Sequence, residues 1–318
     1  MKESQIKENS DTTSRVISEI KLAIILPVFN NLQYTKKCLE TLYQNRDNAR
    51  LTKEQVKIVI TDDGSKDGTS EWLANNYPEV YVLKGNGNLW WSGGVNKGIR
   101  FALNELKADY ILWWNNDIQP ADDYLANLFN ILLSLDEKIL VGSKIFMMHK
   151  NLIWGMGGKF DPQSGIRHMI GERQPDSETF SRPAEADWFP GMGTTMHRSV
   201  FEKIGYLDEK NFPQYHGDGD FTWRAKKAGY KLIAYPNLII RNDNTNTGLI
   251  HQGSFKKLYK SLTDIKSNYN FSKDFIFYRK YATSPLAYVS LFKRYLRYIG
   301  GFFKWKALSA LGIKKKAA

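Results

Sequence analysis

The chain has 318 residues, of which 42% are hydrophobic and 25% charged, a composition typical of a folded protein and not of a disordered one. A single cysteine, Cys38, excludes an intrachain disulfide and favours a reducing compartment. No apolar run approaches the ~20 residues of a transmembrane helix, and the first twenty residues lack the basic-then-apolar order of a secretion signal.

The formal net charge of +12 is concentrated in the C-terminal part of the sequence. Residues 251–318 hold 15 of the 45 Lys and Arg but only Asp264 and Asp274 as acids, a net charge of +13. The first 250 residues therefore carry −1, so the sequence predicts a nearly neutral body with a basic C-terminal region.

The first 145 residues alternate between strand and helix patterns. Short apolar or β-branched runs predict strands at 22–28, 56–60, 80–83 and 110–114. Apolar residues at helical spacing, or a capping residue, predict helices between them at 32–43, 70–76 and 95–106. This alternation predicts an α/β fold with a mostly parallel sheet covered by helices on both faces.

The second half follows a different pattern. Residues 139–196 predict short strands joined by Gly-rich turns, and helices are expected at 199–204 and 221–228. Beyond residue 251 the chain is predicted to be mainly helical, with basic and aromatic residues interleaved. The expected organisation is a poorly ordered segment at 1–20, two halves of one α/β unit at 21–145 and 146–250, and a helical region at 251–318.

Acidic and amide side chains follow two of the predicted strands. Residues 61–69 (Thr-Asp-Asp-Gly-Ser-Lys-Asp-Gly-Thr) follow the second strand, and residues 115–117 (Asn-Asn-Asp) follow the fourth. Either cluster alone can be an ordinary Asx turn. Because ligands of parallel α/β sheets bind outside the carboxyl ends of the strands, two clusters at that edge favour a binding site.

Three stretches of this half together carry a family resemblance. They are Leu26-Pro27-Val28-Phe29-Asn30, then Tyr34-Thr35 with Cys38-Leu39, and then residues 61–69. In this order and spacing they closely resemble the nucleotide-binding half of family 2 glycosyltransferases, which are inverting enzymes. The resemblance implies a GT-A fold, a Rossmann-like, mostly parallel sheet flanked by helices, to which the basic region after residue 250 is expected to add a helical extension. It also implies that Asp63 contacts the base of a nucleotide-sugar donor, in a site with Pro27, Phe29, Asn88, Trp90 and Asn116.

Residues 115–117 stand where the family usually has Asp-x-Asp, which holds a divalent cation against the donor diphosphate. The resemblance therefore makes Asp117 a ligand of Mg²⁺ or Mn²⁺, with Asn115 as a weaker, neutral ligand. His251 lies near where some relatives place a metal-binding histidine. Asn-Asn-Asp variants are familiar in the rhamnosyltransferase-like branch, which favours dTDP-rhamnose as donor. The alternative for residues 115–117 is an Asx turn.

The glycine-rich residues 85–98 lie between a predicted strand and a predicted helix. They are not a dinucleotide fingerprint, because the Gly-x-Gly-x-x-Gly spacing is absent and Trp90-Trp91 fills the gap. Glycines let the backbone approach a ligand, and the N-terminus of the following helix favours a diphosphate. In the family this loop helps to line the donor pocket. One tryptophan is expected in the core and the other on the base or sugar, and the sequence does not say which.

The stretch from His216 to Phe221 (His-Gly-Asp-Gly-Asp-Phe) resembles the family's Glu-Asp-x-Asp at the start of a helix. The first aspartate of its Asp-x-Asp pair is the general base, so the resemblance assigns this role to Asp218. Gly217 replaces the glutamate. Asp220, near the N-terminus of this helix, is expected to interact favourably with the helix macrodipole and to form an i,i+4 pair with Arg224.

The resemblance also indicates the acceptor side and the mode of transfer. Residues 188–196 match the family's Gly-rich strand, which places Trp188, Gly191 and Met192 beside the acceptor. The Gln-x-x-Arg-Trp sequence of processive synthases is absent, which favours transfer of a single sugar.

Residues 284–305 mix aromatic and aliphatic residues with Lys and Arg. This stretch is too apolar for a solvated charge run and too charged to span a bilayer, and an interfacial amphipathic helix on an anionic membrane surface explains both facts. The alternative is a C-terminal helix packed on the body. Nucleic-acid binding is not expected, because no helix-turn-helix, zinc-finger or RNP-type motif accompanies the charge.

The resemblance implies a metal-dependent glycosyltransferase, and the basic, aromatic C-terminal region predicts that it is cytoplasmic and peripheral on the inner face of the cell membrane. Its expected acceptor is a hydroxyl of a glycan or of a polyprenyl-diphosphate-linked sugar in bacterial surface polysaccharide assembly. Two alternatives stay open: a sugar nucleotidyltransferase, and a non-catalytic sugar- or membrane-binding module in which Asn115 and Gly217 mark the loss of activity. The sequence does not specify the sugar, the acceptor or the oligomeric state.

Overall fold

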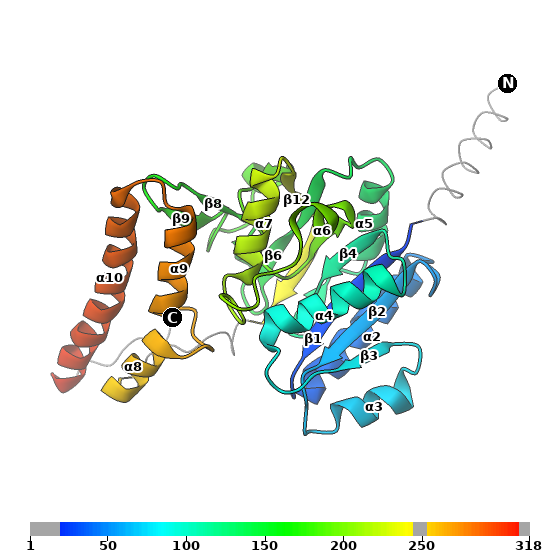
Figure 1. Cartoon of the computed structure of the whole chain (residues 1–318), viewed down its shortest axis with the longest axis horizontal. Coiled ribbons are helices and arrows are strands. Elements are labelled where there is room, and N and C mark those ends of the chain that lie inside the picture. Colours follow the sequence, from blue (N-terminus) through cyan, green and yellow to red (C-terminus); the bar gives the residue numbers. More distant parts are fainter. Residues whose placement is uncertain (1–19, 244–252, 312–318) are drawn as a thin grey trace.

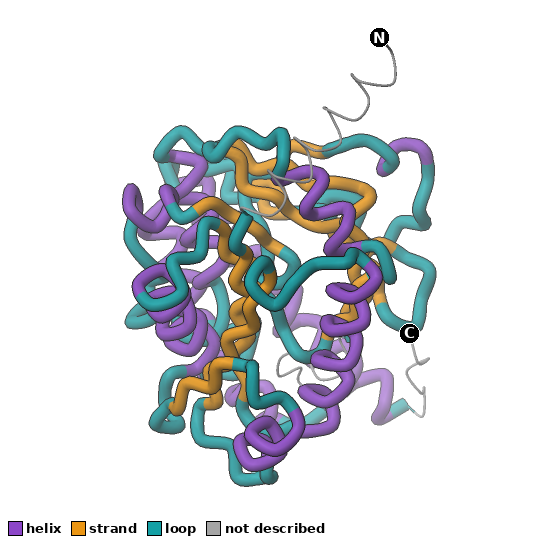
Figure 2. Tube along the Cα trace, turned by 90° about the vertical axis from the view of Figure 1, so that its right-hand side faces the viewer, coloured by secondary structure: helices purple, strands orange, loops and turns teal. Residues whose placement is uncertain are grey.

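The computed structural model of the chain describes residues 20–243 and 253–311. In this part of the chain a ten-stranded mixed sheet has the order β10-β12-β6-β11-β4-β1-β2-β3, with β5 added to β12 and β7 added to β6. Helices cover the sheet on both sides (Figures 1 and 2). The strands are β1 (Leu22–Val28), β2 (Val56–Asp62), β3 (Tyr81–Lys84), β4 (Tyr110–Trp113), β5 (Ile118–Pro120), β6 (Ile139–Met147), β7 (Ile153–Gly155), β8 (Gly158–Phe160), β9 (Arg167–Met169), β10 (Ala184–Glu185), β11 (Thr194–His197) and β12 (Lys231–Asn242).

The helices lie between these strands and after them. They are α2 (Leu32–Asn48), α3 (Thr69–Asn76), α4 (Trp90–Asn104), α5 (Tyr124–Leu132), the short 3₁₀ helix η1 (Glu178–Phe180), α6 (Ser199–Ile204), α7 (Gly217–Lys227), α8 (Phe255–Thr263), α9 (Phe271–Tyr281) and α10 (Pro285–Ala310). No helix in the described part of the chain combines the length and the apolarity needed to cross a membrane.

The sheet is parallel where the sequence alternates strand and helix. β1 pairs in parallel with β2 and β4, and β2 pairs in parallel with β3. β11 runs antiparallel between β4 and β6, and β12 is parallel to β6. The loops after β1, β2 and β4 therefore meet at one edge, as expected for the carboxyl ends of parallel strands.

Each face of the sheet has its own apolar core. Along β1, Leu22, Ile24 and Leu26 belong to the core under α2 and α5, whereas Ala23 and Ile25 belong to the core under α4, because side chains alternate along a strand. Gly98 lets α4 approach β1: a Cβ atom at this position would lie 2.6 Å from a side-chain carbon of Ile25.

Two helices begin earlier than the sequence predicted. The helix expected at 95–106 begins at Trp90, because the carboxylate of Asp63 accepts the backbone N–H groups of Leu89 and Trp90 at the turn into the helix. The helix expected at 221–228 begins at Gly217, immediately after His216 with its left-handed φ of 69°. Asp218 therefore lies in the first turn of α7.

The C-terminal helices pack against α7 and the β8–β9 hairpin, on the side remote from β3 (Figure 1). Phe160 of β8, Trp223 of α7, Phe277 of α9 and Leu291 of α10 are members of one buried cluster. One face of α10 is thus packed on the body, as the alternative for residues 284–305 expected.

Two buried aspartates fasten α9 to the rest of the protein. Asp220 of α7 pairs with Arg224 at 3.0 Å, which confirms the expected i,i+4 pair, and it also accepts bonds from Lys280 and from the hydroxyl of Tyr281. Asp274 of α9 is fully buried. Its carboxylate forms ion pairs with Arg167 of β9 at 2.6 Å and with Arg294 of α10 at 2.8 Å. It also accepts a hydrogen bond from the Tyr295 hydroxyl at 2.7 Å.

Burial alone would raise the pKa of Asp274, but the neighbouring Arg167 and Arg294 guanidinium groups hold it well below its usual range. The ionised carboxylate therefore joins β9, α9 and α10. Because the pKa is lowered by folding, this contribution to stability is present above the pKa of an unfolded aspartate and declines as the pH falls below it.

We expect Asp274→Ala to lower the free energy of unfolding by about 3–5 kcal/mol, because it leaves two guanidinium groups partly buried without their carboxylate. Denaturant unfolding followed by circular dichroism measures this change. Glu202→Ala is the matched control, because Glu202 pairs with Arg198 at the surface and its side chain is 62% exposed; it should change stability by under about 1 kcal/mol. Equal effects of the two substitutions would contradict the role given to Asp274.

Candidate active site

A cleft of about 440 Å³ brings together residues that are far apart in the sequence. Its lining includes Asn115 and Asp117 from the loop after β4, Trp188, Gly191 and Met192 from the segment before β11, and Asp218 from α7. The residues predicted to serve the metal, the acceptor and the general base thus share one cavity.

The backbone around Asp218 fixes its carboxylate. Oδ2 accepts the N–H of Gly191 and Oδ1 accepts the N–H of Gly219, both at 2.8 Å. Burial raises the pKa of Asp218, and these two N–H donors limit the rise. The result is a carboxylate held at the cleft wall with a higher proton affinity than a solvated aspartate, which suits a general base.

Close packing explains two glycines beside Asp218. A Cβ atom on Gly191 would lie 2.1 Å from the ring of Trp91, and one on Gly217 would lie 2.2 Å from Ser92 Oγ. A side chain at the position where the resemblance expects a glutamate would therefore require Ser92 to move. Ser92 occupies that space, and its hydroxyl donates to the carbonyl of Phe212 at 2.5 Å.

Asp117 has an unsatisfied oxygen. Its Oδ1 is shielded from solvent and has no hydrogen-bond partner in the described part of the chain. Burial, together with the nearby charge of Asp243, raises the pKa of Asp117 to about 6. Asp243 follows β12, donates its N–H to the Asp117 carbonyl at 3.0 Å and accepts a bond from the Tyr34 hydroxyl at 2.9 Å.

These two carboxylates fit a divalent cation with hard oxygen ligands, since a cation would satisfy the unpartnered oxygen and lower both proton affinities. No group of three or more His, Cys, Asp or Glu with metal-site geometry occurs among the residues that the structure describes. His251 lies outside the described residues. Asn115 Oδ1 accepts the Trp91 indole N–H at 2.9 Å, so this oxygen already has a partner.

The two tryptophans of the glycine-rich loop have different surroundings. Trp91 packs edge-on against Trp113 with ring centroids 5.8 Å apart and lines the cleft. Both rings are half-buried, but Trp91 also packs against the apolar core under α4, whereas the Lys266 ammonium lies 5.9 Å from the ring centroid of Trp90. Trp91 is therefore the inner residue of the pair, which the sequence left open.

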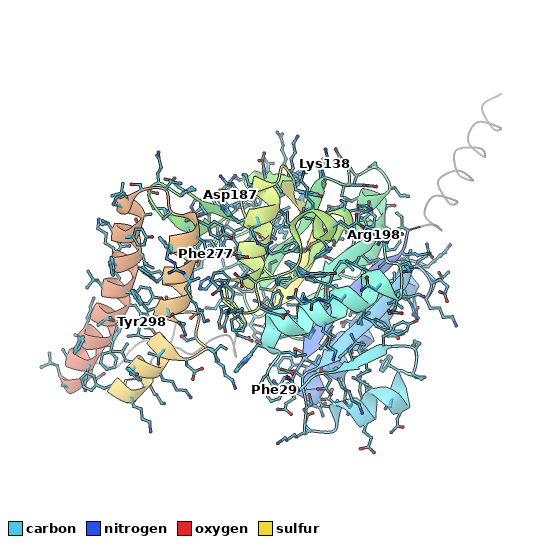
Figure 3. All side chains as sticks on the ribbon, viewed as in Figure 1. Phe29, Lys138, Asp187, Arg198, Phe277 and Tyr298 are labelled. Atoms are coloured by element: carbon cyan, nitrogen blue, oxygen red, sulfur yellow. The ribbon has the colours of Figure 1, made fainter. Side chains whose placement is uncertain are left out.

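Asp63 holds the glycine-rich loop and does not line this cleft. Its carboxylate accepts the N–H groups of Gly87, Leu89 and Trp90 at 2.8–3.1 Å. The expected donor residues around it are more open: Asn88 is exposed and Phe29 is 51% exposed. Phe29 directly follows β1 and lies at the lower edge of the body in Figure 3.

The two remaining donor candidates take part in packing. Pro27 lies against α4, where a Cβ atom on Gly94 would approach it to 2.9 Å. The side-chain amide of Asn116 donates to Thr35 Oγ1 at 3.1 Å, which ties the loop after β4 to α2.

Sequence reasoning missed several residues of the cleft. Asp243 belongs to a polar run after β12 that had no assigned role, and only its contact with Asp117 identifies it. Arg167 and Arg294 both line the cleft, yet one lies in a three-residue strand and the other in the basic C-terminal region. No local pattern connects them, because their shared partner, Asp274, lies on a third element.

Comparisons with known proteins identify the family of the chain. The family described as Glycosyl transferase family 2 matches residues 23–205. The low-salt glycan biosynthesis hexosyltransferase Agl10 of Haloferax volcanii is 27% identical over 179 residues, 56% of this chain and 55% of that protein. An uncharacterized glycosyltransferase of Rickettsia typhi is 24% identical over 88% of this chain and 87% of its own length. The N-acetylglucosaminyl-diphospho-decaprenol L-rhamnosyltransferase of Mycobacterium tuberculosis is 25% identical over 58% of this chain and 66% of its own length.

Solved structures show the same fold. GalNAc-T7, solved with UDP, GalNAc and Mn²⁺, superposes with a TM-score of 0.55 over 77% of this chain and 48% of that one, at 14% identity. Residues 1–349 of S. aureus TarS give a TM-score of 0.50 over 71% of this chain and 61% of that one, at 14% identity. The expected GT-A-like α/β fold is confirmed. With more than half of its length matched by the family, the chain belongs to glycosyl transferase family 2.

Proposed function

We propose that this protein transfers one sugar, with inversion, from a nucleoside diphosphate sugar to a hydroxyl of a glycan or polyprenyl-diphosphate-linked acceptor. The observation that carries the proposal is the single cleft shared by Asp117 and Asp218. Family membership favours glycosyl transfer over the two alternatives, a nucleotidyltransferase and a non-catalytic binding module.

Asp218 is the general base of the proposed reaction. Its carboxylate takes the proton of the acceptor hydroxyl while that oxygen forms a bond to the anomeric carbon of the donor sugar. The bond from the anomeric carbon to the diphosphate breaks, and the nucleoside diphosphate leaves. Attack from the face opposite the leaving group inverts the anomeric carbon, as in inverting glycosidases.

The donor side rests on Asp117 and on the end of β1. Asp117 and Asp243 would hold Mg²⁺ or Mn²⁺, which when bound supplies positive charge to the donor diphosphate. The half-exposed ring of Phe29 is suited to stacking on the nucleotide base, beside the loop that Asp63 orders. The similarity to a rhamnosyltransferase and the Asn-Asn-Asp loop favour dTDP-rhamnose as donor and bacterial surface polysaccharide as product.

The proposal predicts that Asp218→Asn lowers kcat at least about 100-fold, because the amide cannot accept the acceptor proton. Release of nucleoside diphosphate from a panel of sugar nucleotides, with Mn²⁺ or Mg²⁺, measures the rate. The same variant should keep cation-dependent donor binding in calorimetry, whereas Asp117→Asn should lose it. Turnover of Asp218→Asn near the wild-type rate would exclude this residue as the base.

The pH dependence of kcat offers an independent test. Burial raises the pKa of Asp218, and this residue can act as a base only when it is ionised. At saturating metal, kcat should therefore begin to fall with decreasing pH before the pH reaches about 4, the ordinary pKa of an aspartate. Circular dichroism at each pH checks that the protein stays folded. A kcat that is constant from pH 7 down to about pH 4 would contradict the assignment.

We also propose that α10 binds the cytoplasmic face of the cell membrane. Val289, Phe292, Leu296 and Phe303 are 44–68% exposed, and their spacing of three, four and seven residues places them on one side of the helix. Lys and Arg of the C-terminal region flank this apolar side, the arrangement of an interfacial helix on anionic lipid.

Phe292→Ser combined with Leu296→Ser should weaken sedimentation with phosphatidylglycerol vesicles at least tenfold, because two exposed side chains no longer enter the interface. Phe29→Ser is the matched control, since Phe29 is about as exposed as Phe292 but follows β1 and does not lie on α10. Point substitutions are preferable to truncation, because α9 and α10 complete a buried cluster. Equal vesicle binding of the double variant and the wild type would remove the membrane proposal.

A further inference from the structure

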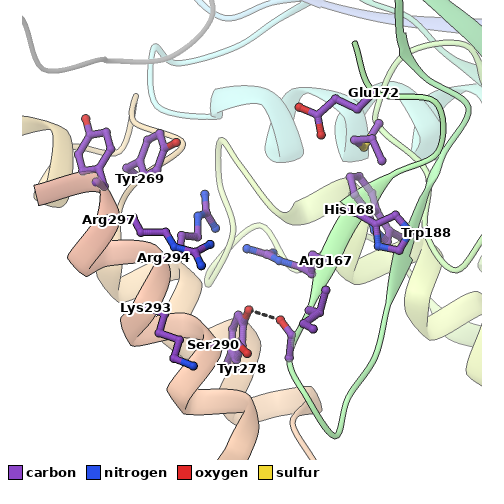
Figure 4. A pocket seen from close by; sticks show the side chains of 14 residues that line it. Arg167, His168, Glu172, Trp188, Tyr269, Tyr278, Ser290, Lys293, Arg294 and Arg297 are labelled. Carbon is purple, nitrogen blue, oxygen red and sulfur yellow. Dashed lines mark hydrogen bonds between the residues drawn. The ribbon is translucent and has the colours of Figure 1, made fainter. Parts of the chain in front are cut away.

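A second cavity, of about 790 Å³, lies between the β8–β9 hairpin and α10 (Figure 4). Arg167, Trp188 and Arg294 line both this cavity and the cleft that contains Asp218. The two cavities are therefore adjacent, and one extended ligand can occupy both. We call the second cavity the basic pocket.

Positive charge dominates the basic pocket. Its lining holds four cations, Arg167, Lys293, Arg294 and Arg297, and one acid, Glu172. Asp274, behind the wall, pairs with both Arg167 and Arg294. The carboxylates of Glu172 and Asp274 balance two of the four positive charges, and the other two have no counter-charge at the pocket among the described residues.

The arginines of the basic pocket differ in how firmly they are held. Asp274 orients Arg167 and Arg294, and Figure 4 shows both guanidinium groups directed into the space between β9 and α10. Lys293 and Arg297 are exposed, one turn apart on α10, and form no ion pair within residues 20–243 and 253–311. Unpaired like charges around one cavity repel each other, and a bound anion would relieve this repulsion.

Guanidinium groups bind phosphate oxygens in a bidentate fashion, so a phosphate or diphosphate is the anion that this lining fits best. The proposed cation site at Asp117 serves the donor diphosphate. The basic pocket holds its charge in side chains, so it binds an anion without a metal.

Resting on the proposed function, we infer that the basic pocket binds the diphosphate of a lipid-linked acceptor while the sugar of that acceptor reaches Asp218. The lipid source follows from α10. Phe292 and Leu296 lie on the exposed apolar side of α10. Each is followed directly by a basic residue of the pocket, Lys293 or Arg297. Because consecutive residues of an α-helix are about 100° apart around its axis, the apolar and basic surfaces of α10 are adjacent. A diphosphate in the pocket thus places its prenyl chain along the apolar side.

The test measures binding of farnesyl diphosphate by calorimetry in EDTA, where a cation-dependent donor site does not bind diphosphate. Lys293→Gln combined with Arg297→Gln should weaken binding at least tenfold. The control is Lys304→Gln combined with Lys306→Gln, which removes the same charge from exposed positions on α10 outside the pocket and should change binding less than twofold.

Two further ligands separate the sources of the anion. Farnesol should bind at least tenfold more weakly than farnesyl diphosphate, and equal binding would overturn the pocket as an anion site. Inorganic pyrophosphate should also bind more weakly, because it has no chain for α10; equal binding would overturn the lipid source. Equal affinity of the Lys293→Gln, Arg297→Gln variant and the control would overturn the proposal as a whole.

This proposal and the proposed function can fail separately. Asp218→Asn should bind farnesyl diphosphate like the wild type, because its carboxylate does not line the basic pocket. Binding that depends on Lys293 and Arg297, without sugar transfer from any donor, would support the pocket and contradict the enzyme. If the Lys293→Gln, Arg297→Gln variant transfers sugar to a lipid-linked acceptor with the same KM for that acceptor as the wild type, the result would support the enzyme and contradict the pocket.

Discussion

The carboxylate of Asp274 joins three segments on which the cleft depends. Arg167 comes from the β8–β9 hairpin, Arg294 from α10, and Asp274 itself from α9. A buried, ionised carboxylate requires partners of opposite charge, and two guanidinium groups meet that requirement. The same ion cluster positions the arginines on the wall between the catalytic cleft and the basic pocket, so the C-terminal helices are part of the site and not an appendage.

The other acidic residues of the site differ in the hydrogen bonds that their carboxylate oxygens accept. Asp63 accepts three backbone N–H groups and Asp218 accepts two, so both are fixed by the main chain. Asp117 has an oxygen that is shielded from solvent and has no hydrogen-bond partner among the described residues. This difference in hydrogen bonding is the physical basis of the separate roles that we propose: Asp63 orders a loop, Asp218 would act as the base, and Asp117 with Asp243 would hold a cation.

The arrangement also relates sugar transfer to a membrane surface. One side of α10 packs on the body through Leu291 and Tyr295, while Phe292 and Leu296 on another side stay exposed. In the proposed function the helix therefore connects the lipid interface to the cleft without spanning the bilayer. The basic pocket lies between the two, where the charged part of a lipid-linked acceptor would be.

Local patterns in the sequence determined the parallel half of the sheet, the loops at its carboxyl edge and the candidate roles of Asp117 and Asp218. Such features follow from the periodicity of short segments and from motifs a few residues long. The tertiary structure alone decided that Trp91 is the inner tryptophan, that Ser92 packs against Gly217, and that Asp243 lies beside Asp117. It also decided that Arg167 and Arg294 share one carboxylate. These contacts join residues from separate elements, and their positions depend on how the elements pack, which no local pattern encodes.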